Sequence, residues 1–376
     1  MIEITDKYEC CGCSACVQRC PQHCIFMKED IEGFLYPIVN QNLCIECGLC
    51  EKVCPVINSK NECTPLKVYA AKNKNVRKQL NSSSGGVFVE LAEYIISRDG
   101  VVFGAAFNEI WEVEHRFVEK AQELPILMGS KYVQSKIGET YLQCESFLKQ
   151  GRDVLFVGTS CQIMGLKLFL RKEYDNLLAV DVICHGVPSP GVWRKYLFEV
   201  MEKQSAQSAA NGENTVLSSS LKTMPVITGI NFREKNGFEW RKYGFVVRGK
   251  SALKADKNLV LLSDIFYYNP FMNVFLANII LRPSCYKCPA KGGRCGSDMT
   301  VADYWGIESV APEFYDDKGV SLVFVHNHKG TVALKSINLC FQESTFEDAI
   351  KNNSSYLQSV VEPKKRIEFF DAFALN

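Results

Sequence analysis

The same spacing of cysteines occurs twice near the start of this chain. Both runs follow the pattern C-x2-C-x2-C-x3-C-P, and the second begins 34 residues after the first. The repeated positions are Cys10, Cys13, Cys16, Cys20 and Pro21, then Cys44, Cys47, Cys50, Cys54 and Pro55. This run of thiolates is typical of modules that hold two cubane iron–sulfur clusters. The repeat therefore predicts an electron-carrying module before any other part of the chain is considered.

The repeat also predicts which cysteines share a cluster. Each cubane takes four thiolates, and the fourth cysteine of such a run ligates the other cluster. We assign one cluster to Cys10, Cys13, Cys16 and Cys54, and the other to Cys44, Cys47, Cys50 and Cys20. Cys11 and Cys24 fall outside the constant offset and are expected to be spare thiols. Structural zinc usually takes separated CxxC pairs instead, and disulfide frameworks belong to small secreted domains.

Composition narrows the class of protein further. The chain has 376 residues, of which 47% are hydrophobic, enough for one or two cores. It contains no apolar run long enough to span a membrane and does not start like a signal peptide. With 18 cysteines, eight of them at cluster spacing, we expect a reducing cytoplasm. A net charge of +1 argues against nucleic-acid binding.

Charge is distributed unevenly along the chain. Residues 1–56 carry four Lys or Arg against eight Asp or Glu. An acidic head of this kind is either an ordinary solvated surface or a surface that docks on a basic patch, which the body of the same chain could supply.

The residue pattern of the sequence changes after the second cysteine run. We expect a cluster module over 1–57, a polar linker over 58–66 and a core over 67–376. Strand and helix patterns alternate through the middle of the core, which predicts an α/β arrangement with a partly parallel sheet. The low-complexity stretch 205–220 is predicted to be a mobile insertion. We therefore expect a chain of the α+β class, with a bacterial dicluster ferredoxin-like module ahead of an α/β core with a mixed sheet.

Several cysteines lie outside the repeat. Cys161 and Cys184 end predicted strands, and cofactors bind at the carboxyl ends of strands in α/β sheets. Cys285 and Cys288 form a lone CxxC, which alone is consistent with half a zinc site, a redox pair or half a cluster site. From the residues alone these alternatives stay open.

Five segments between about residues 80 and 307 carry a resemblance to a known family: SSSGGVF, GSKYVQS, VLFVGTSCQIMGLK, ICHGVPSP and RPSCYKCPAKGGRCGSDMTVADYWGI. They resemble landmarks of the coenzyme F420 hydrogenase/dehydrogenase beta-subunit family. Its members are iron–sulfur flavoproteins, among them flavin subunits of archaeal deazaflavin-linked hydrogenases and dehydrogenases. Bacterial members often accompany genes for cell-surface polysaccharides.

The resemblance implies a third cubane cluster in the core. Its ligands would be Cys161, Cys184, Cys285 and Cys288, with Cys295 as a rival for one of these places. One departure is Ser160, where the family usually has proline before the cysteine; this could loosen the turn without removing a ligand.

The resemblance also implies bound FAD. Ser84, Gly85 and Gly86, before a predicted helix, and Lys131 and Tyr132 would contact it. Without the resemblance the serines are equally natural helix caps and the lysine an ordinary surface residue. No GxGxxG fingerprint is present, so we expect no Rossmann site for NAD. No catalytic residue is assigned; His185, which follows a proposed ligand, and Lys131 are candidates, and a structural role for the histidine is equally compatible with the sequence.

The expected function is that of a flavin-dependent oxidoreductase that passes electrons between its clusters and FAD. It would reduce or oxidise a small organic substrate, and cell-surface polysaccharide metabolism is one setting that the resemblance implies. A ferredoxin or another redox protein would be its partner, without nucleic acid or a membrane span. The alternative is an electron-transfer subunit of a larger dehydrogenase or hydrogenase complex that uses the reduced deazaflavin coenzyme F420. The third alternative is a non-enzymatic scaffold stabilised by zinc or by clusters.

Overall fold

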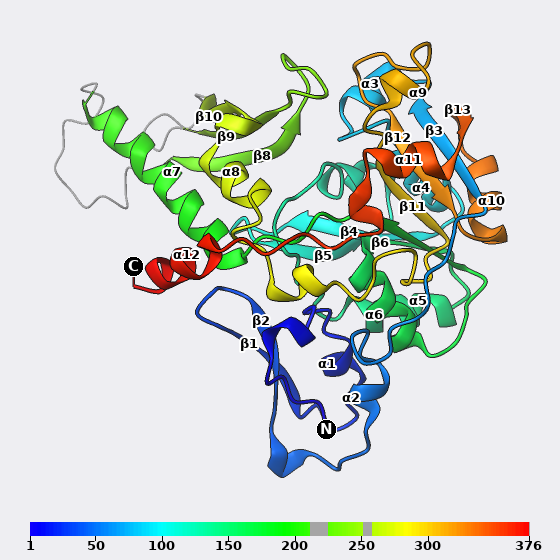
Figure 1. Ribbon diagram of the computed structural model, residues 1–376, viewed down its shortest axis with the longest axis vertical. Coiled ribbons are helices and arrows are strands. Elements are labelled where there is room, and N and C mark those ends of the chain that lie inside the picture. Colours follow the sequence, from blue (N-terminus) through cyan, green and yellow to red (C-terminus); the bar gives the residue numbers. More distant parts are fainter. Residues whose placement is uncertain (211–224, 251–257, 376) are drawn as a thin grey trace.

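The computed structural model describes residues 1–210, 225–250 and 258–375. They form an N-terminal module with a two-stranded sheet, a large eight-stranded mixed sheet with its helices, and a three-stranded antiparallel sheet (Figure 1). The predicted α+β class, with a small module ahead of a mixed-sheet core, is confirmed.

The N-terminal module places its two cysteine runs on two short helices. Strands β1 (Ile25–Glu29) and β2 (Leu35–Val39) pair antiparallel, and the helices are α1 (Ala15–Arg19) and α2 (Leu49–Lys52). Short 3-10 turns, η1 (Lys7–Glu9) and η2 (Gln41–Leu43), precede the two cysteine runs. Each helix follows a residue in left-handed conformation, Ser14 or Gly48, with φ of 57° and 71°. This sharp turn brings the third cysteine of each run back beside the first two.

The main sheet has the strand order β13-β3-β12-β11-β7-β6-β4-β5. Its central strands β11, β7, β6 and β4 run parallel, and the outer pairs are antiparallel. Central segments such as VLFV in β6 are apolar throughout because both faces of the sheet are covered. The strands are β3 (Lys67–Asn73), β4 (Val101–Phe107), β5 (Val113–Val118), β6 (Val154–Thr159), β7 (Leu177–Val182), β11 (Met299–Asp303), β12 (Ser321–Val325) and β13 (Leu339–Ser344).

Different helices cover the two faces of this sheet. On one face, α4 (Val87–Ile96) and α10 (His328–Lys335) pack on Val102 and Leu155. On the other, α5 (Thr140–Lys149) and α6 (Ser160–Leu170) pack on Phe103 and Phe156, in a cluster that also contains Cys13 and Val53 of the module. The cluster module is therefore part of the hydrophobic core. Short helices at the edges are α3 (Val76–Leu80), η3 (Ala121–Ile126), α9 (Ile307–Val310), α11 (Phe346–Lys351) and η7 (Ser354–Tyr356).

The three-stranded sheet is a separate layer beside the long helix α7 (Figure 1). Aromatic side chains hold it together, including Trp193, Phe232, Phe245 and Phe271. The strands of this sheet are β8 (Val226–Glu234), β9 (Gly244–Lys250) and β10 (Asn258–Ile265). The remaining helices and turns of the chain are α7 (Pro190–Ala210), η5 (Phe266–Tyr268), α8 (Pro270–Leu276), η6 (Pro283–Lys287) and the C-terminal α12 (Lys365–Ala374).

The stretch 205–220, predicted to be a mobile insertion, begins within helix α7. Residues 205–210 continue α7, because the run of Ser, Ala and Gln carries no Gly or Pro that would end a helix. Residues 211–220 lie outside the described part of the chain. None of the helices in the described part combines the length and the apolarity that a bilayer span requires.

The acidic hairpin of the module meets arginines of the body. Glu32 accepts hydrogen bonds from Arg366 at 2.5 and 3.0 Å, and the Glu29 carboxylate pairs with Arg194. Ser189, just before α7, donates its hydroxyl to the Glu32 carbonyl, and Gly33 lies directly against Gly191. The expected contact between an acidic head and basic residues of the same chain is therefore seen at this seam.

Candidate iron–sulfur and cofactor sites

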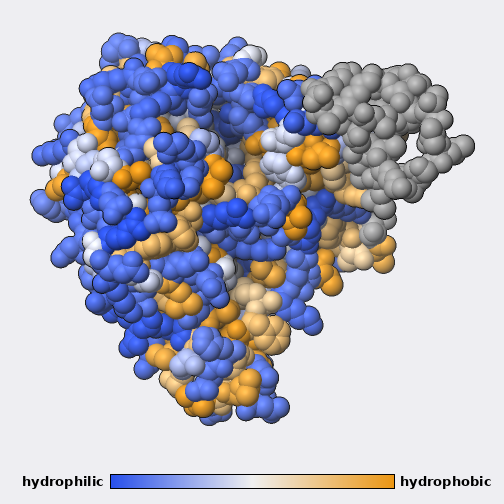
Figure 2. All heavy atoms as spheres, turned by 180° about the vertical axis from the view of Figure 1, so that it is seen from behind, coloured by the Kyte–Doolittle hydropathy of each residue, from blue (hydrophilic) through white to orange (hydrophobic). Residues whose placement is uncertain are grey.

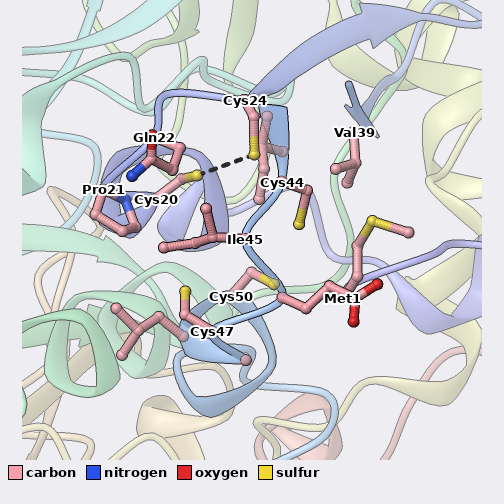
Figure 3. A pocket seen from close by; sticks show the side chains of 14 residues that line it. Met1, Cys20, Pro21, Gln22, Cys24, Val39, Cys44, Ile45, Cys47 and Cys50 are labelled. Carbon is pink, nitrogen blue, oxygen red and sulfur yellow. Dashed lines mark hydrogen bonds between the residues drawn. The ribbon is translucent and has the colours of Figure 1, made fainter. Parts of the chain in front are cut away.

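One hollow at the tip of the module is surrounded by cysteines of both runs. Figure 3 shows Cys44, Cys47 and Cys50 facing Cys20 across a space of about 350 Å³, its open mouth included. Cys24 also lines it, with its sulfur 3.4 Å from that of Cys20. We call the hollow bounded by Cys20, Cys44, Cys47 and Cys50 the distal site. Its Cys47 is exposed to solvent.

A second hollow, of about 330 Å³, lies where the module meets the body. Cys54 of the second run joins three cysteines of the first run around it, and all four are buried. We call this the proximal site; its members are Cys10, Cys13, Cys16 and Cys54. The structure thus brings together the same two crossed sets of four cysteines that the spacing predicts.

A third hollow, of about 440 Å³, lies in the body and contains all four cysteines that the family resemblance implies. Cys161 opens α6 directly after β6, and Cys184 follows the parallel neighbour β7, while the other two come from η6 and its end. Two strand ends and one loop therefore converge on one space. We call this the core site; its members are Cys161, Cys184, Cys285 and Cys288.

The structure bears on two points about the core site that the sequence left open, the rival cysteine Cys295 and the serine at position 160. Cys295, the rival ligand, does not line this hollow; it is buried and its thiol lies 3.5 Å from the Ser297 hydroxyl. Ser160 does not loosen the turn, since its hydroxyl donates to Asp181 at 2.6 Å. The helix start is further held by a reciprocal cap between Thr159 and Gln162.

Cys11, expected to be a spare thiol, lines both the proximal and the core hollow. The neighbouring Cys13 thiol and burial raise the pKa of Cys11 well above its ordinary value. Cys11 therefore joins the two sites, a position that no spacing rule in the sequence could have indicated.

The geometry of the three hollows suits clusters better than single ions. In residues 1–210, 225–250 and 258–375, no three His, Cys, Asp or Glu side chains lie close enough to share one metal ion. Each set of four cysteines instead surrounds a hollow, as the four iron corners of a cubane require. The residues present therefore fit the implied group at all three places.

The serine–glycine loop implied as a flavin contact is tied to the main sheet. Ser84 donates its hydroxyl to the Val320 carbonyl at 2.9 Å, and the Gly85 amide donates to the Ser321 hydroxyl at 2.9 Å. A side chain at Gly85 would meet the Ala71 carbonyl at 2.2 Å. Close approach to the sheet thus explains this glycine, and its amide is already used. Gly86, with φ of 89°, is the residue before α4.

The second implied flavin segment touches the first. Ser130 donates its amide and hydroxyl to the Ser83 hydroxyl at 2.7 and 3.0 Å, which places Lys131 and Tyr132 beside the loop. The Lys131 ammonium donates to the Met128 and Gly129 carbonyls and forms no ion pair with a described carboxylate. Burial lowers the pKa of Lys131 to about 7.

Two buried cations that the sequence did not single out complete this region. Lys235, on the turn after β8, donates to the Ser84 carbonyl at 3.0 Å, and burial lowers its pKa to about 7. Arg233 pairs with Asp303 at the carboxyl end of β11, yet its Nε and Nη2 have no hydrogen-bond partner among the described residues. We call Lys131, Arg233 and Lys235 the basic cluster.

His185 and Lys131, the two catalytic candidates, belong to different sites. His185 lines the core hollow and its Nε2 lies 2.6 Å from the Asn278 amide oxygen. Burial lowers the pKa of His185, so a neutral ring is favoured near the cysteines. Its position supports a role in orienting the core site, whereas Lys131 belongs to the basic cluster.

The fold and the three cysteine sites define an iron–sulfur protein with a dicluster head on an α/β body. The 4Fe-4S dicluster domain family matches residues 9–58, and a ferredoxin-1 from Caulobacter vibrioides is 38% identical over 53 residues, 14% of this chain and 42% of that protein. The family described as the C terminus of the coenzyme F420 hydrogenase/dehydrogenase beta subunit matches residues 151–345. The chain belongs to this family, and an iron–sulfur module precedes the family region.

Relatives in the family match this chain over only part of their own length. The F(420)H(2) dehydrogenase of Methanosarcina mazei has an F subunit that is 24% identical over 48% of this chain and 55% of its own length. Coenzyme F420-dependent sulfite reductase of Methanocaldococcus jannaschii is 26% identical over 50% of this chain and 29% of its own length. The chain thus spans about half or less of these relatives. A chain of the F420-reducing NiFe hydrogenase complex from Methanosarcina barkeri aligns over 83% of this chain and 91% of its own, at 14% identity and a TM-score of 0.42.

Proposed function

We propose that this protein is the electron-transfer subunit of an oxidoreductase linked to coenzyme F420, with three cubane clusters in a row. The observation that carries the proposal is the position of Cys11. Cys11 lines both the proximal and the core hollow, and the proximal site shares its module with the distal site. The three hollows therefore form one continuous path from the tip of the module into the body.

The distal site is the expected place of electron exchange with a partner. Apolar side chains gather at the tip of the module, which is the lower end of the molecule in Figure 2. Ile45, beside the exposed Cys47, has 60% of its surface exposed, and Leu43 has 55%. An exposed cluster ligand within an apolar rim suits a short-lived contact with a ferredoxin or a partner subunit.

The proposal also includes a bound flavin. The residues that would hold it are the basic cluster, Tyr132 and the Ser84 carbonyl region, since Arg233 carries two buried donors without a described partner. Such donors are costly unless an acceptor meets them, and a pyrophosphate or the ring carbonyls of a flavin would supply one. When bound, FAD exchanges single electrons with a cluster and pairs of electrons with an organic hydride donor.

The names of the relatives favour the F420-linked alternative over a private organic substrate. Nothing in the fold or in the relatives points to cell-surface polysaccharide, so we do not extend the proposal to it. The hydride donor or acceptor is then the deazaflavin coenzyme, and the electrons travel along the clusters to or from a redox partner.

Anaerobic analysis of the purified chain tests this proposal. We expect about twelve iron atoms and one FAD per chain, because three four-iron sites are present. Reduced F420 should bleach the flavin and then the clusters, whereas NADH should not. Zinc in place of iron would refute the proposal. A content of about eight iron atoms would show that the core site holds no cluster. Iron without flavin would refute the flavin and leave only electron transfer between the clusters.

The basic cluster gives the flavin a pH dependence. The pKa values of Lys131 and Lys235 are lowered to about 7 by burial, so both ammonium groups lose their protons as the pH rises through that range. A bound anion favours the protonated lysines, and above pH 7 binding must therefore take up protons. We expect the affinity for FAD, measured by fluorescence quenching, to fall as the pH rises from 7 to 9. An affinity independent of pH would exclude these lysines from the site.

A further inference from the structure

Arg282 lies between the proximal and the core site and has no carboxylate to balance its charge. Its side chain is completely buried, it belongs to the wall of the core hollow, and it is wedged against the first cysteine run. No ion pair joins it to any Asp or Glu in the described part of the chain, whereas the buried Arg233 has Asp303. Burial of an unpaired charge is strongly unfavourable, so a compensating anion is expected nearby.

Nε and Nη2 of the guanidinium contact the module, and Nη1 contacts the body. Nε donates to the Cys10 carbonyl at 2.6 Å, and Nη2 donates to the Leu35 carbonyl at 2.9 Å and to the Cys10 sulfur at 3.5 Å. Nη1 donates to the Gln134 amide oxygen at 3.0 Å. The plane also lies 4.3 Å from the Tyr36 ring. These groups satisfy the donors, but none of them carries a full negative charge unless Cys10 is a thiolate.

Gln134 fixes this arrangement from the body side. While its oxygen accepts from Arg282, its nitrogen donates to the Cys11 carbonyl at 3.0 Å. A side chain at Gly12 would come within 2.8 Å of both Arg282 and Gln134, so the backbone of the cysteine run is pressed directly onto the pair. The guanidinium is therefore held against the proximal site by the packing of three segments.

We propose that Arg282 is a positioning residue for electron transfer, the buried counter-ion that tunes the proximal cluster. The inference rests on the proposed function, since it needs a cubane at the proximal site. Four thiolates make such a cluster anionic, and reduction adds one electron and one negative charge. A fixed cation at hydrogen-bond distance from a ligand sulfur stabilises the reduced form more than the oxidised form. Arg282 thereby favours an electron resting beside Cys11, next to the core site.

The test is an anaerobic potentiometric titration of the full chain followed by electron paramagnetic resonance. In Arg282→Gln, the ratio of reduced to oxidised proximal cluster at a fixed potential should fall at least tenfold, which is ~59 mV for a one-electron couple. The distal signal, assigned by its change in Cys47→Ser, should stay in place. Arg282→Lys, which keeps the charge, should lie between Arg282→Gln and the unmodified chain.

Gln134→Glu tests the charge without removing the arginine. The substitution keeps the size of the side chain and places a carboxylate at the atom that already accepts from Arg282, so the guanidinium is neutralised as a pair; it also removes the hydrogen bond that Gln134 donates to the Cys11 carbonyl. The proximal ratio should again fall, by a similar factor. Arg366→Gln is the matched control, because it loosens the same seam at Glu32 without a contact to any cysteine of the proximal site; it should leave both signals unchanged.

Three results would overturn the inference while leaving the proposed function intact. They are an unchanged proximal potential in Gln134→Glu, equal shifts of both clusters, and a shift in Arg366→Gln as large as in Arg282→Gln, each with iron content maintained. If Arg282→Gln does not fold, the isosteric Gln134→Glu still decides the question. Absence of iron from the module of the unmodified chain is a different outcome, because it refutes the proposed function itself.

Discussion

Cys184→Ala is expected to lower the iron content from about twelve to about eight atoms per chain. Alanine cannot ligate iron, and Cys184 is one of the four thiols proposed as ligands at the core hollow. The module should keep its two clusters because their eight cysteines lie elsewhere. Iron and sulfide analysis of anaerobically purified protein, with electron paramagnetic resonance of the reduced sample, measures the loss.

Cys295→Ala is the matched control for the core site. Cys295 is a buried cysteine of the same region, but it lies outside the hollow and close to Ser297. Its replacement should leave about twelve iron atoms in place. Loss of iron in Cys295→Ala together with retention in Cys184→Ala would show that the ligand set is wrong.

Gly33→Ala is expected to loosen the module from the body. Gly33 has φ of 83°, and a side chain there would lie 2.5 Å from the Gly191 backbone and 2.9 Å from the Ser189 hydroxyl. The left-handed conformation costs about 1 kcal/mol for alanine, and forced overpacking costs about 1–3 kcal/mol more. Chemical denaturation should show the lower stability, and electron transfer from the distal to the core site should slow.

Gly151→Ala separates the two contributions. Gly151 has nearly the same backbone conformation, with φ of 80°, but its side chain would meet no atom within 4 Å. It should show only the conformational cost of about 1 kcal/mol and unchanged electron transfer. Equal destabilisation by the two substitutions would mean that the tight seam at Gly191 contributes nothing.

Features that depend on the spacing of residues within one short segment could be predicted from the sequence. The cysteine repeat predicted both crossed sets of the module, because ligand spacing is a local property of a short backbone segment. The alternation of strand and helix patterns predicted a partly parallel sheet, because parallel neighbours are usually joined by a helix. The strands β10 and β13 were not predicted; the first runs on into an aromatic segment, and the second is an edge strand of mixed polarity.

The remaining residues of interest depend on contacts between distant segments. Arg233 and Lys235 look like ordinary charges on an alternating strand until β8 is placed beside Asp303 and Ser84. Cys11 looks like a spare thiol until α6 brings Cys161 against it. Gly85 was predicted to approach a cofactor, whereas in the fold it approaches the Ala71 carbonyl of the sheet. Periodicity and spacing contain no information on any of these pairings.

Cys20 and Cys54 each reach across to the hollow that the other run builds. With clusters bound as proposed, each cluster has ligands from both cysteine runs and so links the two halves of the module. Loss of either cluster would free one cysteine of the run that supplies most ligands of the other cluster. Maturation of the module is then expected to be all-or-none, with no stable species that contains one cluster. Loss of the exposed distal cluster to oxygen would free Cys20 and remove one of the two links between the halves, so we expect the proximal cluster to become less stable as well.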